Sequence, residues 1–277
     1  MYCTVSTARG TSLAHNHCPC PRRPTVPHLN KLAILGLLPL ALRAAAAPQG
    51  SGTDDSQPLS VRPFTAVYQI EWHGITAGYS TVTLSQPSPG TYEYSSVNRP
   101  RGIFRLAFPD AITEKSIFQM RDGHVEPLRY QEDNGRGRNQ NVSLEFDWST
   151  GRAKGTASGK AVDQPLPPGT QDPLSVQVEL MRDLLAGHAP ARFLLFDHDI
   201  AKEYHYTREG TAVVDTDMGP IDTVIYRSDR PDSDRVMRLW LAPSLGYLPV
   251  EGVRRRKGKV EFELHIHELK RAALPQG

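Results

Sequence analysis

Apolar and polar side chains alternate through most of this chain from residue 64 onward. Every second residue of segment 64–72 is apolar: Phe64, Ala66, Tyr68, Ile70 and Trp72. Successive side chains of a strand point to opposite faces of a sheet, so this period of two predicts a strand with one strongly apolar face. His73-Gly74 is typical of a turn, and residues 75–86 are predicted to form the returning strand.

Similar segments recur at intervals of roughly ten residues, which is typical of an antiparallel sandwich or barrel. Turn dipeptides such as Asp122-Gly123 and Asn134-Gly135 separate several of them, and a short helical turn is predicted at 103–108. The further predicted strands cover residues 91–99, 111–120, 125–131, 139–148, 152–158, 192–198, 203–208, 212–217, 222–228, 236–241, 248–256 and 259–269.

One longer helix interrupts this pattern. The segment DQPLPPGT (163–170) forms a boundary before it, and Asp172-Pro173 can cap and open the helix, which is predicted to span 172–187. Its apolar stripe falls at helical spacing: Leu174, Val178, Met181 and Leu185. We therefore predict a mainly β fold, either a curved antiparallel sheet or a partly closed barrel or sandwich, with this one helix packed on its inner side.

The N-terminal region has the order of a secretory signal. Lys31 precedes the apolar run LAILGLLPLAL (32–42), and small residues follow up to Ala47. A signal typically has about 7–15 apolar residues, whereas a membrane-spanning helix needs roughly 20, so this run fits the signal. We expect cleavage near Ala47, a periplasmic location and no membrane span in the processed chain.

Residues 1–25 are rich in breakers and lack an apolar period. A signal usually begins close to its apolar run, so we predict that translation starts near Val26, which N-terminal sequencing of the precursor would test. The predicted organisation is a signal region at 1–47, a flexible leader at 48–62, a single β domain at 63–271 and a tail at 272–277.

Loss of the signal region changes the chemistry of the chain. All three cysteines lie within it, at positions 3, 18 and 20, so the processed chain has neither a disulfide nor a thiol nucleophile. Residues 48–277 carry 27 basic and 30 acidic side chains, against 32 and 30 in the whole chain. We therefore expect no nucleic-acid partner.

Four segments carry a resemblance to a known family. They are HGITAGYSTVTL (73–84), QDPLS (171–175), MGPIDTVIYR (218–227) and WLAPSLGYLPV (240–250). With these segments in this order, residues 64–270 resemble the bacterial exported family known as domain of unknown function 3108. The resemblance implies an exported envelope protein of mainly β fold, and it supplies no catalytic residues.

Aromatic residues are the candidates for ligand contacts in a cavity of such a sheet. Rings provide large apolar surfaces, and those of Tyr and Trp also carry a polar group. The candidates are Trp72, Tyr79, Trp240 and Tyr247. A structural role as core or rim aromatics is the alternative.

His265 and His267 are the candidate metal ligands. Residues i and i+2 of a strand share a face, so two imidazoles in this spacing can bind one ion. Glu261 and Glu263 share that face, and apolar residues alternate with them on the other. A solvated polar face is therefore the alternative.

Two charged segments complete the candidates. Asp197-His198-Asp199 brings two carboxylates to a strand end, where they can serve acid–base chemistry or form a solvated turn. The run RRRK (254–257) can contact anionic lipid headgroups or a phosphate-bearing ligand, or protect a sheet edge.

The sequence lacks GxSxG, HExxH, P-loop and GxGxxG patterns, so we predict no catalytic residue and no cofactor.

The favoured hypothesis is a non-catalytic binding or carrier module for a lipid-like or other amphiphilic envelope component. A curved sheet that is wider than its own side chains can fill leaves room for an apolar ligand. A structural or assembly partner in the cell envelope is one alternative, and a hydrolase acting on envelope polymers is another. A solvent-accessible apolar cavity favours the first, an exposed apolar patch over a filled core the second, and converging titratable groups the third.

Overall fold

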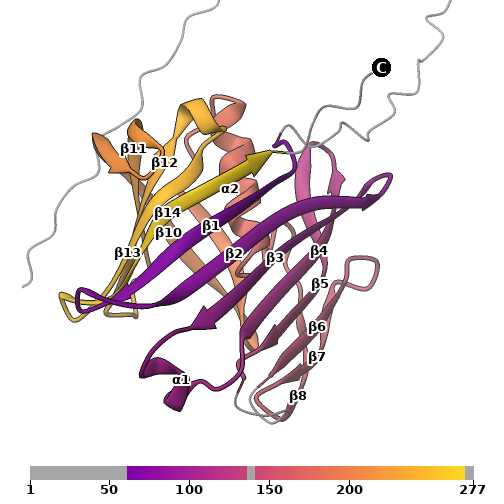
Figure 1. Cartoon of the computed structure of the whole chain (residues 1–277). Coiled ribbons are helices and arrows are strands. Elements are labelled where there is room, and N and C mark those ends of the chain that lie inside the picture. The colour runs from indigo at the N-terminus through magenta and orange to yellow at the C-terminus, as the bar shows by residue number, and fades with distance from the viewer. Residues whose placement is uncertain (1–60, 136–140, 272–277) are drawn as a thin grey trace, which may run out of the picture. The chain divides into compact units, whose positions relative to one another are not determined.

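A computed structural model describes residues 61–135 and 141–271 of the chain. These residues form one antiparallel sheet of fourteen strands with two α-helices. Figure 1 shows the curvature of this sheet. The first half contains β1 (Phe64–Trp72), β2 (Ile75–Ser88), β3 (Thr91–Pro100), α1 (Phe104–Ala107), β4 (Ile112–Arg121), β5 (His124–Asp133), β6 (Val142–Asp147), β7 (Arg152–Ala157) and β8 (Lys160–Pro165). The second half contains α2 (Ser175–Leu185), β9 (Arg192–Asp197), β10 (Ile200–Thr216), β11 (Gly219–Asp229), β12 (Arg235–Ala242), a 3₁₀ turn (Pro243–Leu245), β13 (Leu248–Arg256) and β14 (Lys259–Arg271).

The strand order is two meanders joined in the middle of the sheet. It runs from β8 down to β1, then from β14 down to β9, and every neighbouring pair is antiparallel. The two meanders meet where β1 pairs with β14, in a register that places Phe64 opposite Arg271. The predicted mainly β fold, a curved antiparallel sheet with one packed helix, is confirmed.

Two element boundaries were predicted wrongly. Residues 203–208 and 212–217 belong to one strand, β10, because Gly210 at a φ of 152° forms a bulge rather than a turn. The segment 163–170, which was predicted as the boundary before the helix, overlaps the end of β8. A proline has no backbone N–H, and it is tolerated at Pro165 because β8 is an edge strand with a neighbour on one side only.

The alternation in β1 produces the sheet's buried face. Phe64, Ala66 and Tyr68 are each at most 6% exposed, whereas the residues between them are half-buried on the other face. The Tyr68 hydroxyl reaches past β14 and donates a hydrogen bond of 2.9 Å to the backbone oxygen of Pro249 on β13. The inner faces of the two meanders therefore contact each other.

Helix α2 lies inside the curve of the sheet and fills part of its interior (Figure 1). Val178 and Met181 belong to a buried group with side chains of β1 to β5, β10 and β12 to β14, whereas Val176 and Leu180 belong to a group with side chains of β9 to β12. The helix is thus buried on nearly all sides and contributes to both groups of core residues. Neither helix of the described residues is long and apolar enough to cross a membrane.

The edge strand β9 is covered by the chain that leads into α2. Gln171 forms an isolated parallel bridge with Leu195, in which its backbone N–H donates to Leu194 and its backbone oxygen accepts from Phe196, both at 2.8 Å. Side chains of β6, β7 and β8 share a buried group with Phe196 of β9. The two edges of the curved sheet therefore approach each other around α2.

Candidate functional site

An apolar cavity of about 990 Å³ occupies the part of the interior that α2 leaves open. Strands β1 to β4 form one wall, β12 to β14 form the facing wall, and the first turn of α2 with Pro173, Leu174 and Gln177 forms the floor. Apolar side chains supply most of the walls, including Ile70, Val82, Tyr94, Ile112, Leu239 and Leu264. The volume lies at the upper end of the range of about 300–1,000 Å³ that is common for small-molecule sites.

A few polar groups project into this apolar space. Arg254 lies over the ring of Phe262, 4.3 Å from its centroid, and its Nε is 2.9 Å from Oε2 of Glu261. These two atoms do not have the geometry of a hydrogen bond, and neither has another hydrogen-bond partner among the described residues. Burial lowers the pKa of Arg254 and raises that of Glu114, which lines the same cavity.

Gln177 adds a further polar contact point at the floor. Its side-chain nitrogen is buried and has no hydrogen-bond partner within the described residues. A buried amide that lacks a partner is destabilising, and a ligand or water with an acceptor group would remove that cost. The cavity therefore combines apolar walls with a small number of separated donors and acceptors.

The cavity reaches solvent at the end of the sheet that carries the β1–β2 turn and α1. Trp72, His73 and Lys259 line it there and are all exposed, and the Trp72 ring lies edge-on to that of Phe104 at 5.8 Å. The opposite end is occupied by α2. The cavity is thus a pocket with one open end.

Of the four aromatic candidates, Trp72 lies at the mouth of this cavity. Tyr79 lies between Gly78 and Ser80, which line the cavity, and its ring faces away from them toward Arg101 and His267. Trp240 and Tyr247 pack, half-buried, against the core residues around the 3₁₀ turn. The cavity-lining residues do not include Tyr79, Trp240 or Tyr247.

His265 and His267 have separate partners. His265 Nε2 is 3.7 Å from Glu263, and His267 Nδ1 hydrogen-bonds the carboxylate of Asp217 in the β10–β11 turn. The two imidazoles are therefore held by different carboxylates. The structure places a different group of potential metal ligands close together within the described residues: His124, Glu179 and Asp183.

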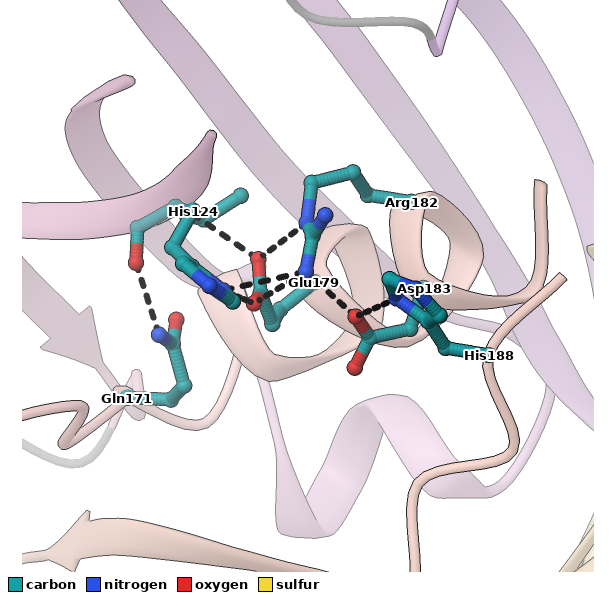
Figure 2. Close-up of polar contacts among 7 residues, drawn as sticks. His124, Gln171, Glu179, Arg182, Asp183 and His188 are labelled. Atoms are coloured by element: carbon teal, nitrogen blue, oxygen red, sulfur yellow. Dashed lines mark hydrogen bonds and ion pairs between the residues drawn. The ribbon is translucent and has the colours of Figure 1, made fainter. Parts of the chain in front are cut away.

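This second group forms a polar cluster between α2 and the β4–β5 turn (Figure 2). Glu179 accepts hydrogen bonds from the backbone N–H of Val125 at 2.8 Å and from Arg182 at 2.9 and 3.0 Å. Arg182 also pairs with Asp183 and approaches Nδ1 of His124 at 3.0 Å. The guanidinium supplies a positive charge beside two buried carboxylates, and the cluster fastens α2 to the sheet.

The segment QDPLS explains how the chain enters α2. Asp172 accepts hydrogen bonds from the backbone N–H groups of Leu174 and Ser175, both at 2.8 Å, and from the hydroxyl of Ser116 on β4. Gln171 donates to the backbone oxygen of Val125 at 2.7 Å. Burial raises the pKa of Asp172 to about 6, against an ordinary value of 3.8. Asp172 therefore caps α2 and connects it to the sheet.

The segment Asp197-His198-Asp199 forms the end of β9 and the tight turn into β10. His198 has a positive φ of 64° in this turn. Asp197 contacts the side chains of Lys202, Tyr204 and Arg230, and its hydrogen bond with His198 holds the pKa of its carboxyl well below the ordinary value. An aspartate held in this ionised state is suited to fixing the turn and not to donating a proton.

The comparisons with known proteins concern family and fold. The family model described as "Protein of unknown function (DUF3108)" matches residues 67–257. No curated protein matches the chain.

Solved structures with low sequence identity also resemble this chain. A β-barrel-like protein of the domain of unknown function DUF1849 from Brucella abortus is 14% identical, with a TM-score of 0.53 over 77% of this chain and 99% of that one. The MucA/MucB complex of Pseudomonas aeruginosa gives 13% identity and a TM-score of 0.33 over 80% of this chain and 54% of the matched chain. The similarity to the Brucella abortus protein supports the β-barrel-like fold. The match to the Pseudomonas aeruginosa structure spans about half the length of its matched chain.

Proposed function

Because this chain belongs to the DUF3108 family of proteins of unknown function, its role has to be inferred from its own cavity, and we propose that it is a non-catalytic binding or carrier module for an amphiphilic envelope component. The observation that carries this proposal is the cavity of about 990 Å³ with apolar walls and one open end. Burial of an alkyl chain against such walls is favourable by roughly 25 cal/mol for each Å² of apolar surface removed from water.

The polar groups suggest how a ligand is oriented. An alkyl chain lies along Ile70, Val82 and Leu264, while Arg254 offers a charged donor to an acidic or otherwise polar headgroup. The Arg254 guanidinium lines the cavity, so an anionic ligand group beside it can accept a charge-assisted hydrogen bond from it. The ligand class is therefore an amphiphile with an acyl or similar chain and a small polar head.

The proposed place of action is the periplasm, after removal of the signal region. The apolar run at 32–42 and the small residues up to Ala47 support this part of the proposal. Cell fractionation with N-terminal sequencing tests it, and the processed chain is expected to begin near Pro48. An unprocessed chain that remains in the cytoplasm would contradict it.

The binding experiment has two parts. Native mass spectrometry of the exported protein, recovered without detergent, is expected to show a mass excess that chloroform–methanol extraction removes. In solution, a fluorescent long-chain fatty acid is expected to bind saturably to the extracted protein. The carrier proposal would be refuted, and an assembly role favoured, if the exported protein carries no extractable amphiphile and the extracted protein shows no saturable fatty-acid binding.

A matched pair of variants locates the binding site. Ile70→Asp places a carboxylate in the cavity wall and is expected to weaken fatty-acid binding at least tenfold, since the buried charge loses its hydration. Thr81→Asp makes a similar change on the neighbouring strand at a position that does not line the cavity, and it should leave binding unchanged. Equal binding by both variants, at unchanged melting temperatures, would place the ligand elsewhere.

A further inference from the structure

The short helix α1 at the mouth of the cavity is apolar on two sides. Phe104 and Phe108 line the cavity. Ile103 and Leu106, three residues apart and therefore on a common face, are 70% and 88% exposed. Large aliphatic side chains in a folded protein are usually buried, so this outward face is an unusual feature of the described surface.

The β1–β2 turn adds further apolar surface beside this helix. Trp72 is 46% exposed and Ile75 is 53% exposed, and the ring of Trp72 contacts that of Phe104. We use the name hairpin rim for residues 72–75, 99–108 and 254–259, which surround the open end of the cavity. The exposed apolar residues of this rim form a group and are not scattered singly.

The hairpin rim is also strongly basic. Residues 254–259 contain five basic side chains and no acidic one, and residues 99–108 contain three arginines and no acidic one. Asp234 is the neighbour of both Arg256, at 3.5 Å, and Lys257, at 3.9 Å. Arg99 and Arg105 are exposed and make no ion pair with any described carboxylate. The rim therefore has an excess of positive charge around its apolar residues.

We infer that the hairpin rim docks on the surface of a lipid bilayer that contains anionic lipid. Peripheral attachment to a bilayer requires apolar side chains that enter the headgroup region together with basic side chains that contact anionic headgroups, and the rim supplies both. Charge complementarity selects an anionic bilayer over a second copy of this chain, whose own rim has the same sign. This docking is independent of whether the cavity holds a ligand.

The orientation that results has a direct consequence for exchange. With Ile103 and Leu106 inserted, the open end of the cavity faces the bilayer. An amphiphile then moves between membrane and cavity without exposing its alkyl chain to water. The rim would thus be the surface through which the proposed carrier is loaded or emptied.

Vesicle sedimentation in 0.1 M salt tests the docking. The processed protein is mixed with vesicles of phosphatidylcholine alone or with 30% phosphatidylglycerol, and it is expected to bind the anionic vesicles and to dissociate in 0.5 M salt. Ile103→Ser/Leu106→Ser should weaken binding at least tenfold. Arg99→Gln/Arg105→Gln/Lys257→Gln should weaken it about 100-fold and reduce its salt dependence, since each basic residue contributes roughly a factor of five.

Matched controls change similar residues outside the rim. Val213→Ser removes an aliphatic side chain that is 64% exposed at the other end of the sheet, and Lys154→Gln/Arg208→Gln removes two positive charges from mid-strand positions. Both controls should bind as the unaltered protein does. Vesicle binding that is absent in 0.1 M salt, or that both rim variants retain, would overturn the inference.

Two further outcomes separate this inference from its alternatives. A dimer in sedimentation velocity that Ile103→Ser/Leu106→Ser dissociates, without vesicle binding, would assign the rim to self-association and overturn the docking. Fatty-acid binding is measured without vesicles, so its loss refutes the cavity proposal alone. Retained fatty-acid binding with absent vesicle binding refutes the docking alone.

Discussion

Replacing Asp172 by asparagine should change how the stability of this protein depends on pH. The carboxyl is fully buried, and burial raises its pKa to about 6, whereas in the unfolded chain it has the ordinary value of 3.8. Folding therefore favours the protonated form. The contribution of this carboxyl to the free energy of unfolding is fully present below pH 3.8 and is lost as the pH rises through 6.

The size of the effect follows from the shift in pKa. A difference of about two units between the folded and unfolded chains corresponds to roughly 3 kcal/mol, at about 1.4 kcal/mol per unit. An asparagine has no carboxyl to ionise, and its amide oxygen can still accept hydrogen bonds from the N–H groups of Leu174 and Ser175. We expect Asp172→Asn to match or exceed the stability of the unaltered protein at pH 7 and to lose this advantage at pH 4.

Urea unfolding at pH 4, 5, 6 and 7 measures the difference. Other carboxyl groups titrate over the same range, so the informative quantity is the free energy of unfolding of Asp172→Asn minus that of the unaltered protein at each pH. Asp172→Ala is the companion variant. It should be less stable at every pH by about 2–4 kcal/mol, because α2 loses its cap and buried donors lose their acceptor. A difference for Asp172→Asn that stays constant from pH 4 to 7 would refute the reasoning.

Two further predictions concern single contacts. Arg182→Met leaves the buried Glu179 without its cation and should lower the free energy of unfolding by about 3–5 kcal/mol, whereas the double variant with Glu179→Gln should recover much of this loss in urea unfolding. Gly78→Ala should cost about 2 kcal/mol or more, because its Cβ would lie 2.3 Å from the backbone oxygen of Arg99. Gly252→Ala is its control, since the nearest atom there is a flexible methionine end, and a smaller fall in melting temperature for Gly78→Ala would contradict the argument.

Much of the fold was predictable because its information is local. The alternation in residues 64–72 and the turn at His73-Gly74 correspond directly to β1 and the β1–β2 turn. The helical spacing after Asp172 likewise predicted α2, although the helix starts at Ser175, and Asp172 accepts hydrogen bonds from the backbone N–H groups of Leu174 and Ser175 at its entrance. Residues 203–208 and 212–217 were predicted as two strands, because alternation does not show that the pairing continues through a bulge at Gly210.

The cavity was harder to predict because it depends on the distance between two faces that belong to opposite halves of the chain. Alternation identifies Val82 on β2 and Leu239 on β12 as apolar strand residues, but it does not indicate how far apart the two walls that contain them stand. Trp72 lies at the mouth, whereas Tyr79 points to the other face of the neighbouring strand. The sequence predicted the helical turn at 103–108, which is α1, but only the folded arrangement reveals that this helix lies beside basic turns distant in sequence.

The pairing of β1 with β14 places the first and last strands of the domain side by side in the middle of the sheet. Each meander can form hairpin by hairpin from neighbouring segments, but this central pair joins segments about 200 residues apart, and closing so large a loop has a high entropic cost. A chain that emerges with its N-terminus first cannot complete the sheet until β14 has appeared. The pairing of Ile70 with Leu264 in the cavity wall therefore cannot form before β14 has been synthesised, so a ligand that needs this wall can bind only after the whole β domain has emerged.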